Sequence, residues 1–157
     1  MNLRKFPMTP RKKIKVDPQF EYLLVRHTWS FKQCGRLSKR YYAVSWIDGK
    51  FTRMHRLITK CPKGYTVDHI NGDGLDNRLS NLRICTQKQN CRNSIWKRGV
   101  SKFKGVSKHQ NTTKWRAYIS FDHKQRHLGY FDSESGAAKA YDVAARKYFV
   151  EYARTNF

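Results

Sequence analysis

The chain has 157 residues, of which 33 are Lys or Arg and 11 are Asp or Glu, giving a formal net charge of +22. Hydrophobic residues make up 39% of the sequence, which favours two or three small cores over one large core. A chain this basic repels itself unless a polyanion is bound, so the composition predicts a nucleic-acid partner. No stretch is long enough to span a membrane, and no membrane partner is expected.

The cysteines lie at positions 34, 61, 85 and 91, and none forms a Cys-x-x-Cys pair. No signal peptide is predicted, because residues 1–16 are basic and lack an apolar run. The sequence therefore predicts an intracellular, reduced protein with free thiols. A zinc site is the alternative for these cysteines.

The first half of the chain begins as an arm and continues as strands. Residues 1–20 combine basic residues with three prolines and are expected to form a flexible basic arm. Residues 41–47 and 50–52 are two β-prone runs separated by Asp48-Gly49, a strong signal for a hairpin. Residues 54–58 are expected to begin a short helix or to end a strand.

The next segment predicts a strand, a loop, a second strand and a helix. Residues 65–70 form a β-prone run that ends at a glycine-rich loop, and residues 81–86 suit the returning strand. Thr86 and Gln89 have the spacing of a capping box, which would open a helix over residues 87–95.

Four polar residues of this segment suggest phosphodiester chemistry. Asp68 precedes His69 at the end of a strand, Asn81 lies twelve residues after His69, and Asn90 projects from the predicted helix. One carboxylate and one amide oxygen, from Asp68 and Asn90, would suit a single hard divalent ion, Mg²⁺ first and Mn²⁺ as an alternative. His69 would accept a proton from the attacking water, with a backbone carbonyl or Asn81 orienting its ring.

The ordered run from Val67 to Arg83, with His55-Arg56-Leu57-Ile58 upstream, resembles the HNH family of homing-type endonucleases in its asparagine-containing form. The resemblance covers roughly residues 53–93 and implies the ββα-metal fold. It also implies His69 as general base, Asn81 as its orienting residue, and Asp68 and Asn90 as ligands of one divalent metal. Arg56 and Arg78 are candidates to clamp phosphate, the alternative being that both are simply solvated.

The second half of the chain predicts a smaller module after a linker at residues 99–104. Three β-prone runs cover residues 105–108, 115–120 and 126–131, and a helix capped by Asp132 or Ser133 is expected from about Glu134 to Phe149. Alanines at 137, 138, 140, 144 and 145 would leave a smooth helix face for a sheet to pack on.

Residues 103–157 resemble the AP2/ERF DNA-binding domain in Phe103-Lys104-Gly105-Val106, His127-Leu128-Gly129-Tyr130-Phe131 and the alanine-rich helix. The resemblance implies a three-stranded antiparallel sheet on one helix, with the sheet in the major groove. Alternation turns Trp115, Ala117 and Ile119 toward the helix. The predicted DNA-contacting residues are Lys104, Ser107, Lys108, His109, Arg116, Tyr118, Ser120, Arg126 and His127. Four aromatic residues are expected in the core instead: Trp115, Tyr130, Phe131 and Tyr141.

Together these patterns predict an α+β protein with an HNH nuclease domain at residues 21–98 and an AP2/ERF-like domain at residues 105–157. The predicted function is metal-dependent hydrolysis of double-stranded DNA, similar to free-standing homing endonucleases of phages and bacteria, with site preference set by the second module. The resemblance implies the cytoplasm of a phage-infected bacterium and no protein partner. The main alternative is a non-catalytic transcription regulator of the AP2/ERF type, and a further one is an RNA-binding or rRNA-processing protein.

Overall fold

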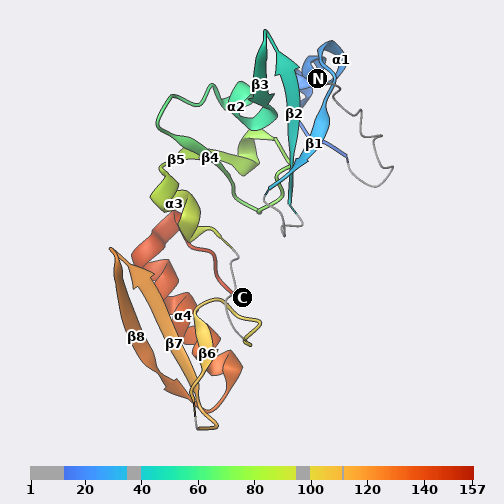
Figure 1. The fold of residues 1–157 in the computed structure, drawn as a ribbon. Helices are drawn as coiled ribbons and strands as arrows, with labels where there is room; N and C mark the ends of the chain where they lie inside the picture. Colours follow the sequence, from blue (N-terminus) through green and yellow to red (C-terminus); the bar gives the residue numbers. More distant parts are fainter. Residues whose placement is uncertain (1–12, 35–39, 95–99, 111) are drawn as a thin grey trace. The chain divides into compact units, whose positions relative to one another are not determined.

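The computed structural model describes residues 13–34, 40–94, 100–110 and 112–157. The chain divides into two compact units between Asn90 and Cys91 (Figure 1). Each unit has its own hydrophobic clusters, in agreement with the several small cores expected from the composition.

The first unit contains short helices and two small antiparallel sheets, one of three strands and one of two. Its elements in chain order are η1 Pro18–Phe20, α1 Tyr22–Arg26, β1 Ser30–Gln33, β2 Tyr41–Ile47, β3 Lys50–Arg53, α2 Met54–Thr59, β4 Thr66–His69, η2 Leu79–Asn81, β5 Leu82–Cys85 and α3 Gln87–Arg92, which ends just beyond the unit boundary.

The three-stranded sheet has the order β1-β2-β3, and its second hairpin is the one predicted at Asp48-Gly49. Both turn residues have positive φ angles, 48° and 69°, as a two-residue type I′ turn requires. The predicted strands are therefore confirmed. Strand β1 and helix α1 were not predicted, because their residues are short polar runs or lie mostly exposed.

Residues 13–20 differ from the free arm that was expected. Lys15 donates its backbone N–H to the Leu75 carbonyl and accepts from the Asn77 N–H, at 2.9 and 2.8 Å. Ile14 and Val16 pack against the hydrophobic cluster of the first unit. This segment is therefore part of the folded unit, while residues 1–12 of the predicted arm lie outside the described residues.

Strands β4 and β5 pair antiparallel, and helix α3 follows β5 directly. The capping box is present, since Thr86 N–H donates to Gln89 Oε1 at 2.8 Å and Gln89 N–H donates to Thr86 Oγ1 at 3.3 Å. The strand, loop, strand and helix expected for residues 65–95 are confirmed, with a shorter helix.

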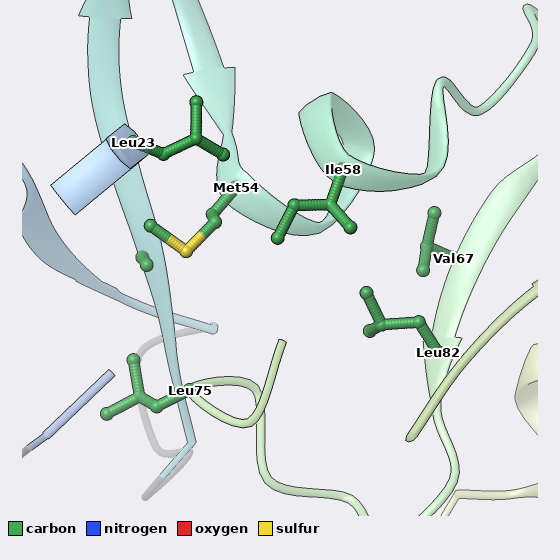
Figure 2. Packing of buried hydrophobic residues seen from close by; sticks show 7 residues of the cluster. Leu23, Met54, Ile58, Val67, Leu75 and Leu82 are labelled. Atoms are coloured by element: carbon green, nitrogen blue, oxygen red, sulfur yellow. The ribbon is translucent and has the colours of Figure 1, made fainter. Parts of the chain in front are cut away.

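One hydrophobic cluster connects these elements. Figure 2 shows the side chains of α1, the start of α2 and the two-stranded sheet converging on a common interior. The cluster consists of Leu23, Ala43, Met54, Ile58, Val67, Leu75 and Leu82. Because Leu75 lies in the loop after β4, this packing fixes the loop that carries the predicted active-site motif.

The second unit is a three-stranded antiparallel sheet, β6-β7-β8, packed on one long helix. Its elements are β6 Val106–Lys108, β7 Trp115–Phe121, β8 Lys124–Phe131, α4 Glu134–Phe149 and η3 Val150–Tyr152. Helix α4 has the predicted bounds, and Ser133 caps it by accepting from the Gly136 N–H at 3.0 Å.

Small side chains allow α4 to lie close to the sheet. Ala137, Ala138 and Ala145 are fully buried against it, as the alanine pattern predicted. Gly105 has a φ of +72°, and a Cβ there would lie 2.0 Å from the Tyr141 ring. Only glycine fits at this approach of the β6 end to the helix.

Two boundaries differ from the expected ones. The division between the units falls at Asn90/Cys91 rather than after residue 98. Ser101 is buried and donates to Glu134 Oε1 at 2.8 Å, so residues at this end of the predicted linker belong to the second unit. The middle of the predicted boundary, residues 95–99, lies outside the described residues.

Candidate active site

His69 is the last residue of β4, and its side chain is 5% exposed. It lies opposite Leu82 in the ladder, on the face where Val67 joins the core. Its Nε2 is 3.4 Å from Asn77 Oδ1, the side chain of a residue that is completely buried. Burial lowers the pKa of His69, opposed by the Asn77 contact and neighbouring carboxylates, so the ring favours the neutral form that a proton acceptor needs.

Asn81 holds the loop after β4 through both ends of its side-chain amide. Its Oδ1 accepts from the Asn71 N–H at 3.0 Å, and its Nδ2 donates to the Asp76 carbonyl at 2.8 Å. The residue that meets the His69 ring is Asn77, which the sequence did not single out. No local signal distinguishes Asn77 from the other polar residues of that loop.

Asp68 points to the opposite face of β4 and is 5% exposed. Arg83, directly opposite on β5, donates from Nε and Nη2 to Asp68 Oδ2 at 2.9 and 2.7 Å. This ion pair compensates the burial of the carboxylate. Arg83 was missed, although pairing His69 with Leu82 would have placed it opposite Asp68.

Asn90 lies in α3, one turn after Thr86 and next to Gln89 of the capping box, and its N–H donates to the Thr86 carbonyl at 3.0 Å. The predicted pair of ligands therefore comes from the end of β4 and from the helix that follows β5. Carboxylate and amide oxygens fit a hard divalent cation that keeps several of its waters. Asp68 would have to share its carboxylate with Arg83 in such a site.

The described ranges contain no group of three or more His, Cys, Asp or Glu side chains placed to hold a metal ion. All four cysteines are free, as predicted, and Cys85 is buried. The zinc alternative therefore has no support in the part of the chain that the structure describes.

His55, Tyr42 and His69 form a cluster of three rings. The His55 ring lies 5.0 Å from that of His69 and 5.2 Å from that of Tyr42, both in edge-to-face geometry. His55 is 5% exposed, and its Nδ1 is buried without a hydrogen-bond partner in the described structure. Burial and the nearby His69 lower the pKa of His55 to about 3, which favours its neutral form near neutral pH.

The two arginines considered as phosphate clamps are both engaged within the chain. Arg56 donates to the carbonyls of Tyr65, Cys61 and Pro62 at 2.9, 3.1 and 3.2 Å, which holds the turn after α2. Arg78 donates from Nε and Nη2 to the two oxygens of Asp76. Neither is merely solvated, and each supports a loop that borders the site.

Asp76 should contribute to stability through its buried contacts. It is 1% exposed, binds Arg78 at 2.7 Å and accepts from Asn71 Nδ2 at 3.0 Å. Replacing Asp76 with Asn should lower the free energy of unfolding by about 1–3 kcal/mol, because the buried side chain loses its charge and one of the two oxygens that accept from Arg78 and Asn71. Urea unfolding at neutral pH measures this loss, with Asp73→Asn, an exposed residue of the same loop, as the matched control. An unchanged midpoint for Asp76→Asn would contradict it.

The same contacts make this contribution depend on pH. The hydrogen bond from Arg78 lowers the pKa of Asp76 below its usual range. Its stabilising effect is therefore fully present above the unfolded value of about 4 and is lost as the pH falls through the lower folded value. The difference between the parent protein and Asp76→Asn should shrink accordingly below about pH 4.

In the second unit, strand register places five of the predicted DNA-contacting side chains on the face away from α4: Ser107, Arg116, Tyr118, Ser120 and His127. Residues directly opposite in the ladder share a face, and Arg116 lies opposite Ser107 while Tyr118 lies opposite His127 and Ser120 opposite Gln125. Ala117 and Ile119 are buried against the helix, which confirms the predicted alternation along β7. The Arg116 guanidinium lies 5.3 Å from the Tyr118 ring, and its Nε is buried without a partner in the described structure.

Tyr130 was expected in the core and lies instead on this outer face, 50% exposed. The register shifts between Ala117 and Tyr118, so that Gly129 pairs with Ala117 and Tyr130 with Arg116. This irregularity reverses the alternation along β8. As a result the Tyr130 ring contacts His109 and His127, with centroids 4.8 and 4.6 Å away.

The other predicted contact residues considered are Lys104, Lys108 and Arg126, and each has different surroundings. Lys108 is exposed. Arg126 lies opposite the buried Ile119, and its guanidinium stacks 5.3 Å from the Tyr148 ring of α4. Lys104 donates to the Arg92 carbonyl, and burial lowers its pKa to about 8. Lys108 pairs with Trp115, and Lys104 and Arg126 each contact a residue of their own unit.

One family model matches part of the chain. Residues 54–92 match the family model described as HNH endonuclease. The chain is 33% identical over 126 residues to "Uncharacterized HNH endonuclease L560" of Acanthamoeba polyphaga mimivirus, covering 76% of this chain and 65% of that protein. It is 37% identical over 68 residues to "Protein 3.8" of Escherichia phage T7, covering 43% of this chain and 56% of that protein.

A different kind of relative is also found. The chain is 42% identical over 66 residues to "Ethylene-responsive transcription factor WRI1" of Arabidopsis thaliana, covering 41% of this chain and 15% of that protein. The chain thus spans less than two thirds of the length of each of these three relatives.

The matched segment begins just before His55 and ends after Asn90, so it includes His55, Asp68, His69 and the capped helix, while Tyr42 precedes it. Residues 54–92 are therefore similar to the HNH endonuclease domain, and residues beyond them are similar to an HNH endonuclease of a virus. No helix among the described residues is long and apolar enough to cross a membrane.

Proposed function

We propose that the protein is a metal-dependent DNA endonuclease of the homing type, acting on double-stranded DNA through a ββα-metal site. The observation that carries this proposal is the buried His69 at the end of β4, which lies within the segment that matches HNH endonucleases, adjacent to Asp68. Asn77, His55 and Tyr42 surround its ring. A net charge of +22 supports a polyanionic substrate.

In this proposal each residue has a separate task. Asp68 and Asn90 would hold one divalent ion, most simply Mg²⁺, and neutral His69 would take the proton of the attacking water. The ion, when bound, supplies charge stabilisation for the phosphate and the leaving oxygen. Asn77 orients the His69 ring, and Asn81 keeps the loop around it in place.

The test is cleavage of supercoiled plasmid by the purified full-length chain with Mg²⁺, with and without a chelator. Conversion to nicked or linear plasmid that stops when the chelator is added supports the proposal. Cleavage unaffected by the chelator contradicts metal dependence. Binding without cleavage under any divalent ion would favour the alternative, a regulator that binds DNA as the name of the Arabidopsis relative suggests for that protein.

We further propose that the second unit is an AP2/ERF-like module that sets the preference for a DNA site. The support is the outer face of the sheet, where Arg116, Tyr118 and His127 are brought together by strand register. A two- or three-stranded β-ribbon fits the major groove, where such side chains reach base edges.

Replacing Arg116 with alanine should blur the site preference by roughly 5- to 150-fold, since a good base contact contributes about 1–3 kcal/mol of discrimination. The measurement is cleavage mapping on a mixed-sequence DNA. Arg146→Ala is the matched control, because it removes the same charge from an exposed position of α4 and should leave the map unchanged. Equal maps for Arg116→Ala and the parent protein would remove this residue from recognition.

A further inference from the structure

One side of the three-stranded sheet β1-β2-β3 carries exposed aromatic rings together with positive charge. Trp46 and Phe51 lie directly opposite each other on β2 and β3, and they are 61% and 47% exposed. Single exposed apolar residues are ordinary on protein surfaces, whereas two large rings paired across neighbouring strands form a patch.

Strand register places two cations on the same side. Lys32 pairs with Tyr42, and Arg53 pairs with Val44. Because Tyr42, Val44 and Trp46 alternate along β2, all of these residues share one face. Lys32 Nζ lies 4.6 Å from the centre of the Phe51 ring, and Lys32 and Arg53 are both exposed. We name this surface the aromatic–cationic face and define it as Lys32, Trp46, Phe51 and Arg53.

The aromatic–cationic face lies on the same side of β2 as one ring of the candidate active site, with the buried Val44 between them. Tyr42, two alternations from Trp46 on the same side of β2, packs its ring 5.7 Å from that of His69 and 5.2 Å from that of His55. Tyr42, which contacts the His55 and His69 rings, therefore lies toward one end of this side of the sheet. The exposed rings of Trp46 and Phe51 lie toward the other end, near the hairpin at Asp48-Gly49.

We propose that the aromatic–cationic face binds DNA bases that have left the duplex stack, so that the preferred substrate is duplex DNA with an unpaired stretch beside the cut. This inference rests on the proposed nuclease function only for the position of the cut. Intact B-form DNA presents base edges in its grooves, whereas an exposed ring can stack only on the face of a base. Base–aromatic stacking flanked by cations is the usual means of binding single-stranded segments.

The chemistry of the face separates this occupant from others. An acidic protein segment would use the cations but would gain little from two bare rings opposite each other. A continuous duplex would use Lys32 and Arg53 as phosphate contacts and leave Trp46 and Phe51 facing water. An unstacked base beside its phosphate uses both kinds of group, and the high positive charge of the chain matches that partner.

The experiment measures binding of the full-length chain, with chelator present, to three labelled DNAs by fluorescence anisotropy. One DNA is an intact duplex, the second carries a single-stranded gap, and the third carries the same gap with abasic sugars in place of the bases. We expect the gapped DNA with bases to bind most tightly. Trp46→Thr and Phe51→Thr should each weaken that binding by roughly 5- to 100-fold and affect the abasic DNA far less.

The threonine variants keep strand propensity, and melting curves confirm that the sheet is folded. Trp46→Phe should restore most of the affinity, because it returns a ring to the position. Tyr22→Ala is the matched control, since it removes an exposed ring from α1 of the same unit. Equal affinity for the gapped and abasic DNAs, or threonine variants that bind like the parent protein, would overturn the inference.

The parent protein and these variants distinguish the proposed nuclease function from the proposed binding of unpaired bases. If the parent protein cuts plasmid with Mg²⁺ but has no preference for unpaired bases, only the inference about the aromatic–cationic face fails. If it prefers the gapped DNA through Trp46 but never cuts, the proposed nuclease function fails and the binding surface stands.

Discussion

Replacing His69 with alanine should lower the rate of DNA cleavage by about 10²–10⁴-fold while leaving DNA affinity nearly unchanged. The expected loss is that of a positioned general base. His69 is buried and directed toward Asn77, His55 and Tyr42, so it is not a residue that holds DNA by its charge.

The pH dependence of cleavage gives an independent measure of the same role. Burial lowers the pKa of His69, so the neutral, proton-accepting form persists below the ordinary histidine value of about 6.5. The acid limb of log kcat/KM should therefore lie below about pH 6.5, with activity present above it and falling as the pH decreases through it.

Two comparisons make the His69 prediction specific. Asn77→Ala removes the acceptor at 3.4 Å from His69 Nε2, together with the hydrogen bond that Asn77 donates to the Leu75 carbonyl, and should lower kcat more than it changes KM, because the base loses its orientation. His27→Ala removes a histidine of the same unit whose ring contacts Trp29 rather than the site. A His69→Ala variant that cuts at the parent rate would show that another group accepts the proton.

The parts of the fold that the sequence predicted are those set by local rules. Asp48-Gly49 requires positive φ angles that few other pairs adopt, and the Thr86–Gln89 capping box satisfies helix donors within four residues. Alternation along β7 separated the buried Ala117 from the outer Arg116, since a strand with one covered face has a period of two.

The parts that were missed depend on contacts between distant residues. Tyr130 changed faces because the β7–β8 register shifts by one residue, which no feature of the β8 sequence itself signals apart from Gly129 at a φ of +129°. Residues 13–20 look like a solvated basic arm, but Lys15 pairs with the backbone of a loop sixty residues later. Charge composition alone does not show such pairing.

The same distinction applies to the candidate site. Asp68, His69, Asn81 and Asn90 were chosen from a motif whose spacing is visible in the sequence. Their partners Asn77 and Arg83 are brought to them by the fold of the loop and by strand pairing. Asn77 contacts the His69 ring, and Arg83 pairs with the Asp68 carboxylate. Arg83 in particular bears on how Asp68 would bind a metal.

Asp68→Asn should reduce Mg²⁺-dependent cleavage by at least about 100-fold, the scale of losing one group that stabilises charge in the reaction. Asparagine keeps the shape of the side chain and removes its charge. Asn90→Ala removes the second proposed ligand and should have a comparable effect. The measurement is the rate of plasmid cleavage as Mg²⁺ is titrated, with Glu21→Gln, an exposed carboxylate changed to an amide on α1, as the control.

Arg83 separates loss of the metal from loss of the fold. Without metal, Arg83 binds Asp68 Oδ2 at 2.7 Å while both side chains are mostly buried, so breaking this pair should destabilise the unit by about 3 kcal/mol. Arg83→Met also breaks the pair but keeps the charged carboxylate and removes the cation that competes with the ion for it. It should therefore lower stability in chelator as Asp68→Asn does, yet reach half-maximal cleavage at a lower Mg²⁺ concentration than the parent protein. If Arg83→Met needs more Mg²⁺ instead, Arg83 supports the ion or the DNA directly, and Asp68 is not shared between them.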